Sequence, residues 1–124
     1  MESTLKPIVI QKLEAIEEAI QVILQRSQEF ATIHDMLSST HGIMVFDSCV
    51  MRLQTIGENV KSIDDRTNGE YLTNYPNIQW KQIIGLRNII SHEYANIDPE
   101  VIWSVISKHL VPLQEEIRRM KSEL

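Results

Sequence analysis

The residue types best suited to chemistry gather in one short segment, Arg87-Asn88-Ile89-Ile90-Ser91-His92-Glu93-Tyr94. Its arginine is a permanent cation that can hold phosphate oxygens and offset negative charge as it develops in a transition state. Its histidine can take up or release a proton near neutral pH. Together, Arg87 and His92 are suited to a reaction at a phosphodiester.

The spacing within this segment matters because the segment is predicted to end a helix. On a helix, Asn88 and His92 lie on one face. Arg87 and Ser91 lie on an adjacent stripe, which includes Tyr94 if the helix continues. An arginine five residues before a histidine also occurs by chance, so a polar helix end that faces solvent explains the spacing equally well.

Four amphipathic helices are predicted to position the segment, because apolar residues recur at steps of three and four. The last helix is the best delimited, since Asp98 is a favourable N-cap and Pro99 suits the first helical position. Pro112 lies inside its apolar pattern and should bend it, because proline cannot donate a backbone hydrogen bond. A polar connection over residues 64–78 contains the turn signal Asn68-Gly69. The predicted helices span about residues 7–29, 43–63, 79–92 and 98–120.

Length and composition set the fold class. The chain has 124 residues, of which 43% are hydrophobic and 23% charged, so it is expected to form a single domain over residues 1–124. No run alternates with the period of a strand, which favours an all-α antiparallel four-helix bundle with room for a short extra helix. Two apolar stripes on the helix at 43–63 suggest contacts inside the bundle and across a partner chain.

The cysteine content and the charge narrow the classes of protein further. One cysteine excludes an internal disulfide, and the absence of a signal peptide or membrane-length apolar run favours the cytoplasm. The net charge of −5 argues against nonspecific coating of nucleic acid or an anionic membrane. Residues 1–65 carry all of this acidity, whereas residues 66–124 carry seven basic and seven acidic side chains. The charge therefore remains compatible with a confined site for a phosphodiester.

The segment over residues 87–94, called the chemical segment below, resembles the R-x4-H-x-Y motif of the HEPN superfamily, specifically its HepT-like (DUF86) ribonuclease toxins. The resemblance covers about residues 43–124 well and the first predicted helix by pattern only. One departure is Gln79, where that family often has proline before the tryptophan, and it touches no catalytic position. The other matching stretches are Ile56-Gly57-Glu58, Tyr75-Pro76-Asn77-Ile78-Gln79-Trp80, Ile83-Ile84-Gly85-Leu86-Arg87-Asn88 and residues 98–103.

The resemblance implies a metal-independent endoribonuclease without a cofactor, the toxin of a toxin–antitoxin pair. The family acts as a homodimer in which the motifs of two subunits meet in a cleft at the interface. On the matching positions, His92 would be the general base or acid for attack by a ribose 2′-hydroxyl, and Arg87 would stabilise the charged transition state. Asn88 and Ser91 would support them, Asn88 by positioning His92 or a phosphate.

The resemblance also implies a protein partner and a modified residue. The cognate antitoxin in this family is a minimal nucleotidyltransferase, which neutralises the toxin by transferring AMP to the motif tyrosine, here Tyr94. An adenylate there would add negative charge and bulk beside Arg87 and His92 and compete with RNA for the cleft.

Several readings of the sequence stay open. Glu58 fits a surface position and a pairing with Arg87 about equally, and Cys49 is expected to be an inert core residue. The acidic balance and the shortage of basic residues favour a second class of function. In that class the chain is a non-catalytic helical module that binds nucleotide, RNA or a nucleotidyltransferase.

Overall fold

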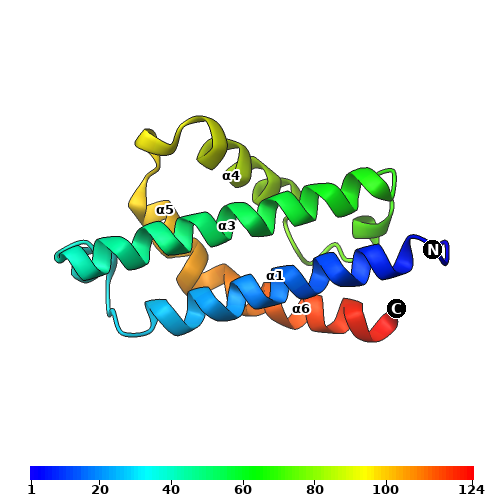
Figure 1. The fold of residues 1–124 in the computed structure, drawn as a ribbon, viewed down its shortest axis with the longest axis horizontal. Helices are drawn as coiled ribbons and strands as arrows, with labels where there is room; N and C mark the ends of the chain where they lie inside the picture. Colours follow the sequence, from blue (N-terminus) through cyan, green and yellow to red (C-terminus); the bar gives the residue numbers. More distant parts are fainter.

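The computed structural model describes residues 1–124, which form helices and no strands. Figure 1 shows α1 and α3 running along the long axis, with α6 beside α1 and α4 on the other side of α3. The predicted all-α antiparallel bundle with a short extra helix, α2, is confirmed. The α-helices are α1 (Lys6–Ser27), α2 (Ile33–Met36), α3 (Thr40–Arg66), α4 (Trp80–His92), α5 (Pro99–Ser104) and α6 (Leu110–Glu123). The turns η1 (Tyr71–Asn74) and η2 (Tyr94–Asn96) are 3₁₀-helical, and η3 (Val105–His109) is π-helical.

Side-chain caps define where the helices begin. The Ser39 hydroxyl accepts a hydrogen bond from the Gly42 N–H at 2.9 Å, so α3 begins at Thr40, three residues before the predicted start. Asp98 caps α5 as predicted, because its Oδ1 accepts a hydrogen bond from the Glu100 N–H at 2.9 Å.

Two irregular backbone features lie where the sequence predicts them. Asn68 and Gly69 have φ values of 57° and 73°, the left-handed conformation that these residue types tolerate best in a turn. Pro112 is the third residue of α6 and offers no N–H to the carbonyl of Lys108. The π-helical turn η3 lies immediately before α6, so the last predicted helix is divided into α5, η3 and α6.

One apolar core fills the bundle. Ile16, Ile56 and Ile117, from α1, α3 and α6, are at most 2% exposed. Cys49 is buried as predicted, and burial raises the pKa of its thiol to about 11. None of the helices is both long and apolar enough to cross a membrane.

Helix α4 is the least covered of the long helices. It packs mainly on α3, and Trp80 and Ile90 are its only buried residues. Ile89 in its last two turns is 46% exposed. One side of the bundle is therefore incompletely closed beside the residues of the chemical segment.

Candidate active site

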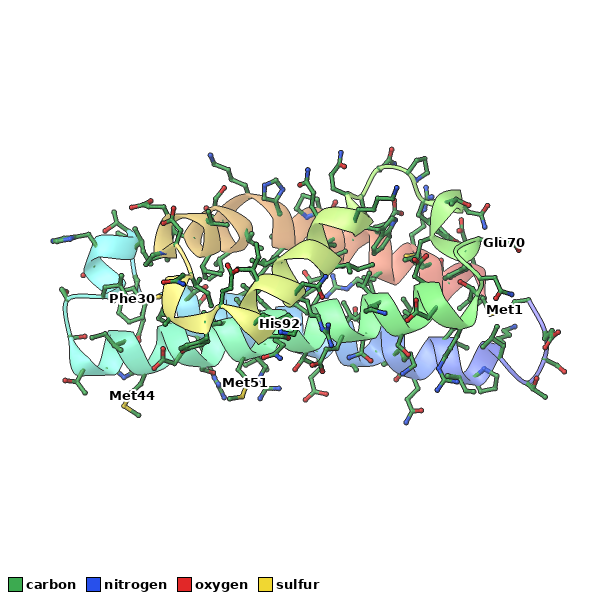
Figure 2. The ribbon with its side chains drawn as sticks, turned by 90° about the horizontal axis from the view of Figure 1, so that it is seen from above. Met1, Phe30, Met44, Met51, Glu70 and His92 are labelled. Atoms are coloured by element: carbon green, nitrogen blue, oxygen red, sulfur yellow. The ribbon has the colours of Figure 1, made fainter.

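The last two turns of α4 carry the four helical residues singled out by the sequence, Arg87, Asn88, Ser91 and His92. Arg87 is half-buried against α3, whereas the other three are exposed. Figure 2 shows His92 on the outside of the bundle, near the part of α3 from which Met51 projects. Arg87 Nη1 donates a hydrogen bond to Asn88 Oδ1 at 2.9 Å. In this structure Asn88 therefore orients the guanidinium group of Arg87.

The position of Arg87 depends on a glycine of α3. A Cβ atom added to Gly57 would lie 2.3 Å from Arg87 Cβ and 2.9 Å from its Cγ, closer than side chains can approach. The aliphatic stem of Arg87 therefore lies directly on the backbone of α3. Its Nε is buried without a hydrogen-bond partner. This contact fixes the arginine, leaving the outer nitrogens of the guanidinium to meet a ligand.

A second contact between the two helices is made by Gln54. Its Nε2 donates to Ser91 Oγ at 3.0 Å and to Glu58 Oε1 at 3.4 Å. One amide thus ties the last turn of α4 to a carboxylate of α3. The exposed helix face that carries His92 is held at two successive points along α3, Gln54 and Gly57.

Tyr94 lies beyond the helix and not on its stripe. Because α4 ends at His92, the continued helix considered from the sequence is absent, and Tyr94 belongs to η2. Its side chain is 54% exposed, and its hydroxyl donates a hydrogen bond to Asp47 Oδ1 at 2.9 Å. Partial burial, followed by the hydrogen bond and charge of Asp47, raises the pKa of Tyr94. The phenol is thus accessible at the end of the motif.

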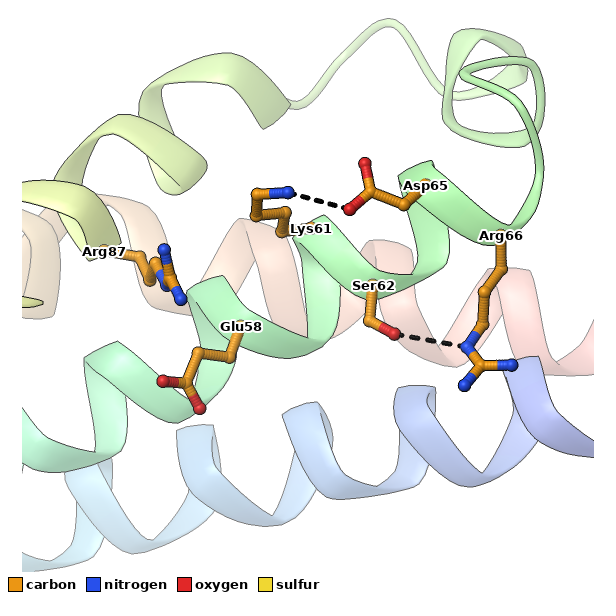
Figure 3. Close-up of a pocket in the computed structure, with 6 residues that line it drawn as sticks. All are labelled: Glu58, Lys61, Ser62, Asp65, Arg66 and Arg87. Atoms are coloured by element: carbon orange, nitrogen blue, oxygen red, sulfur yellow. Dashed lines mark hydrogen bonds and ion pairs between the residues drawn. The ribbon is translucent and has the colours of Figure 1, made fainter.

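A charged pocket of about 360 Å³ opens beside Arg87 (Figure 3). Lys61 Nζ and Asp65 Oδ2 form an ion pair at 2.7 Å within it. Glu58 is exposed in the same pocket and forms no ion pair with Arg87, so the surface position is the one that the structure adopts. The lining residues other than Arg87 all belong to α3: Glu58, Lys61, Ser62, Asp65 and Arg66.

An apolar groove of about 570 Å³ lies between α4 on one side and α5, η3 and α6 on the other. Ile89 of α4 and Val101 of α5 both line it and are 46% and 48% exposed. Leu53 and Ile56 of α3 also line it. The groove reaches the chemical segment because Ile89 lies between Arg87 and His92 in the sequence.

Of the α3 residues that support this site, the sequence indicated Glu58 but not Asp47, Gln54, Lys61 or Asp65. Asp47, Gln54, Glu58, Lys61 and Asp65 recur at helical spacing and share one face of α3. That polar stripe between two apolar stripes was the available signal, and it marks the face on which α4 lies. No group of three or more histidine, cysteine, aspartate or glutamate side chains is placed to hold a metal ion.

A helical bundle with an arginine and a histidine at the end of one helix agrees with the HEPN resemblance of the motif. The chain belongs to the HepT-like family, because the family model described as ribonuclease HepT-like matches residues 13–120. The family inferred from the motif is thereby confirmed.

Individual relatives agree with this family. A candidate RNase of Methanocaldococcus jannaschii is 28% identical over 104 residues, which cover 84% of this chain and 87% of that protein. A protein of Thermococcus cleftensis named as a probable ribonuclease HepT is 24% identical over 109 residues, 88% of this chain and 92% of its own. A second M. jannaschii protein, named as a gamma-glutamylcyclotransferase and candidate RNase, is 29% identical, and the match covers 90% of this chain but 47% of that protein. No solved structure matches this chain.

Proposed function

We propose that this chain is a metal-independent endoribonuclease that acts in the cytoplasm as the toxin of a toxin–antitoxin pair. The observation that carries the proposal is the placement of two residues in a chain of a ribonuclease family. Gly57 holds Arg87 against α3, and His92 is exposed at the end of the same helix. A held cation and a solvent-accessible imidazole at the end of one helix are groups that can offset charge and transfer a proton in the cleavage of a phosphodiester.

In the proposed reaction, the ribose 2′-hydroxyl attacks the adjacent phosphorus and the bond to the 5′-oxygen of the next nucleotide breaks. One proton leaves the attacking hydroxyl and one is delivered to the departing oxygen, and His92 performs one of these transfers. Arg87 offsets the negative charge that grows on the non-bridging oxygens. The products are a 2′,3′-cyclic phosphate and a 5′-hydroxyl.

We infer that two copies of the chain form the complete site. The reaction needs a proton acceptor and a proton donor, whereas one chain supplies a single motif histidine. The apolar groove beside α4 and the exposed Ile89 support a second copy on this side, because burial of apolar surface drives association. A two-fold axis there would bring two copies of the Arg87–His92 face together.

We infer that Tyr94 is the residue through which the activity is switched off. A minimal nucleotidyltransferase would transfer AMP from ATP to the Tyr94 hydroxyl, with release of pyrophosphate. The exposure of the phenol supports this role. Incubation with the cognate nucleotidyltransferase, ATP and Mg²⁺ should raise the intact mass by one or more AMP units. A Tyr94→Phe chain that gains the same mass would contradict the assignment.

Cleavage of RNA in the presence of EDTA tests the proposed chemistry. The wild-type chain should cleave, and Arg87→Ala and His92→Ala should not. His34→Ala is the matched control, because His34 is exposed on α2 and lies outside the site. Loss of wild-type cleavage in EDTA, or undiminished cleavage by the His92 variant, would contradict the proposal.

The acidic balance of the chain favours one other candidate, a non-catalytic module that binds nucleotide, RNA or a nucleotidyltransferase. This candidate predicts stable complexes and no cleavage without metal. The same EDTA assay, run beside a binding measurement on the same RNA, separates the two.

A further inference from the structure

We propose that Lys61, Ser62 and Arg66 form a subsite for RNA backbone phosphates next to the phosphate held by Arg87. The proposal rests on the ribonuclease function proposed above and names a part of the substrate that lies beyond the scissile bond. The three side chains lie on the C-terminal half of α3 and line the same pocket as Arg87 (Figure 3).

The contacts between α3 and α4 place this subsite on one side of the reacting phosphate. Ser91 contacts Gln54, and Arg87 lies on Gly57. Moving along α3 toward its C-terminus, one therefore passes the histidine end of the motif, then the arginine, and finally Arg66. A strand whose scissile phosphate is held at the motif can continue over the pocket and reach Arg66.

The length of this path suits more than one nucleotide. From Gly57 to Arg66 the helix rises about 14 Å, at about 1.5 Å per residue. Phosphates of one strand follow each other at about 3.4 Å along a duplex axis. The subsite therefore contacts phosphates beyond the scissile one, and only RNA longer than a dinucleotide can use it.

Two of the three cations of the pocket, Arg66 and Arg87, are available to a ligand, whereas Lys61 is paired with Asp65. Arg66 and Arg87 form no ion pair, and Arg66 Nε has only the Ser62 hydroxyl as a partner, at 3.4 Å. Each of these guanidinium groups can thus form charge-assisted hydrogen bonds with a phosphate without displacing a carboxylate. The cations near the end of α6 differ, because each is engaged by Glu17 or Glu116: Arg118, Arg119 and Lys121.

Two carboxylates also line the pocket and limit its affinity for phosphate. Asp65 neutralises Lys61 at 2.7 Å, and Glu58 lies near Arg87. Three cations and two carboxylates leave a small positive excess in a chain whose net charge is −5. The balance yields a signed prediction: loss of the Arg66 charge weakens RNA binding, and loss of the Asp65 charge strengthens it.

The test uses strands that cannot be cleaved because every ribose carries a 2′-O-methyl group. Binding of a dinucleotide and of a strand of about eight nucleotides is measured by fluorescence anisotropy at several salt concentrations. Arg66→Gln should raise the Kd of the longer strand about fivefold at low salt. The association constant falls as salt rises, and Arg66→Gln should reduce the magnitude of the slope of its logarithm against log salt by about 0.7, the value for one phosphate contact to a single strand. Asp65→Asn should lower that Kd, and both variants should bind the dinucleotide as the wild type does.

Lys108→Gln is the matched control, since Lys108 is exposed on η3 and does not line the pocket. Equal binding of the longer strand by wild type and Arg66→Gln, or weaker binding by Asp65→Asn, would overturn the subsite. Cleavage of ordinary RNA is measured in parallel. Wild-type cleavage with no effect of Arg66→Gln at any strand length overturns the subsite alone. The predicted binding changes in a chain that does not cleave RNA would support the subsite while contradicting the nuclease.

Discussion

At the scale of single residues, Arg87 is positioned by the absence of a side chain at residue 57. Its Cβ and Cγ occupy the space that a Cβ of residue 57 would need. The buried, unpaired Nε costs free energy, because a buried donor without a partner loses its hydration. We interpret this cost as the consequence of holding the charged end of Arg87 at one place beside the pocket.

Gly57→Ala is predicted to displace Arg87. The added Cβ forces α3 and α4 apart or rotates the arginine, so the free energy of unfolding should fall by about 1–3 kcal/mol and RNA cleavage should decline. Urea denaturation and the cleavage rate at 25 °C measure the two effects.

Gly85→Ala is the matched control for this change. Gly85 also lies in a helix, but an added Cβ meets no atom within 4 Å. The alanine should therefore stabilise α4 by about 0.5–1 kcal/mol, the ordinary gain over glycine in a helix. Equal effects of the two substitutions on stability would contradict the close approach at Gly57.

The hydrogen bond between Tyr94 and Asp47 predicts a pH effect. Partial burial raises the Tyr94 pKa, and Asp47 raises it further because its carboxylate accepts the phenol hydrogen bond and disfavours a second negative charge. The contact therefore stabilises the fold below the ordinary tyrosine pKa of 10.0, and this stabilisation is lost as the pH rises through the higher folded-state value.

Asp47→Ala should lower the Tyr94 pKa, and Asp47→Asn, which keeps a hydrogen-bond acceptor, should lower it less. Ultraviolet titration of each variant, after subtraction of the Tyr94→Phe curve recorded in the same background, isolates this phenol. An unchanged midpoint in Asp47→Ala would show that the contact does not exist in solution.

At the scale of helices, the polar stripe of α3 acts as the support for α4. Gln54 bridges Ser91 and Glu58, and this bridge lies between the contacts made at Asp47 and Gly57. Side-chain contacts at intervals of about one or two turns of α3 thus fix the position of α4 and of η2 along that helix.

Gln54→Ala should misplace the last turn of α4. We expect kcat to fall about tenfold with little change in KM, because misplacement of the motif by Gln54→Ala should cost about 1.4 kcal/mol of transition-state stabilisation. The free energy of unfolding should change by less than about 1 kcal/mol. Gln21→Ala, at an exposed position of α1, is the control. If the Gln54→Ala chain cleaves RNA with the kcat of the wild type, Gln54 does not position the last turn of α4 for the reaction.

The helices were predictable where short-range signals decide the structure. Asp98 marks the start of α5, and Asn68-Gly69 marks the turn after α3, because caps and turns depend on residues next to one another. The motif likewise placed Arg87 and His92 at the end of a helix. The end of α4 at His92 agrees with the predicted range of 79–92, and Glu93, with a φ of −136°, is the residue at which the backbone leaves the helical conformation.

The supporting contacts were beyond prediction because they join residues far apart in the sequence. Gly57 and Arg87 are 30 residues apart, and Asp47 and Tyr94 are 47 apart. Helical periodicity identifies which face of α3 is polar, but the register of α4 on that face is set by packing. The resemblance pointed to Gly57 without giving a physical reason for it.

At the scale of the whole molecule, the incompletely closed side of the bundle predicts self-association. Ile89→Asp places a charge at the rim of the apolar groove and next to the motif. If a second copy covers this side, the variant should be monomeric at concentrations at which the wild type is dimeric, since burial of an unpaired charge is costly. Light scattering after size exclusion measures the mass.

Lys108→Asp, a charge introduced on exposed η3 and outside the groove, should leave the association unchanged. A wild-type chain that is monomeric throughout, or an Ile89→Asp chain that still dimerises, would contradict the groove as the interface. Loss of cleavage together with loss of the dimer would link the interface to the site.

The most direct measurement compares the cleavage of two strands of one sequence, both in the presence of EDTA. One strand is RNA, and the other is the same strand with every 2′-hydroxyl replaced by hydrogen. If His92 and Arg87 promote attack by the 2′-hydroxyl, the wild-type chain cleaves the RNA to 2′,3′-cyclic phosphate ends and leaves the deoxy strand intact. Equal cleavage of both strands, or no cleavage of either until a metal ion is added, would contradict the account.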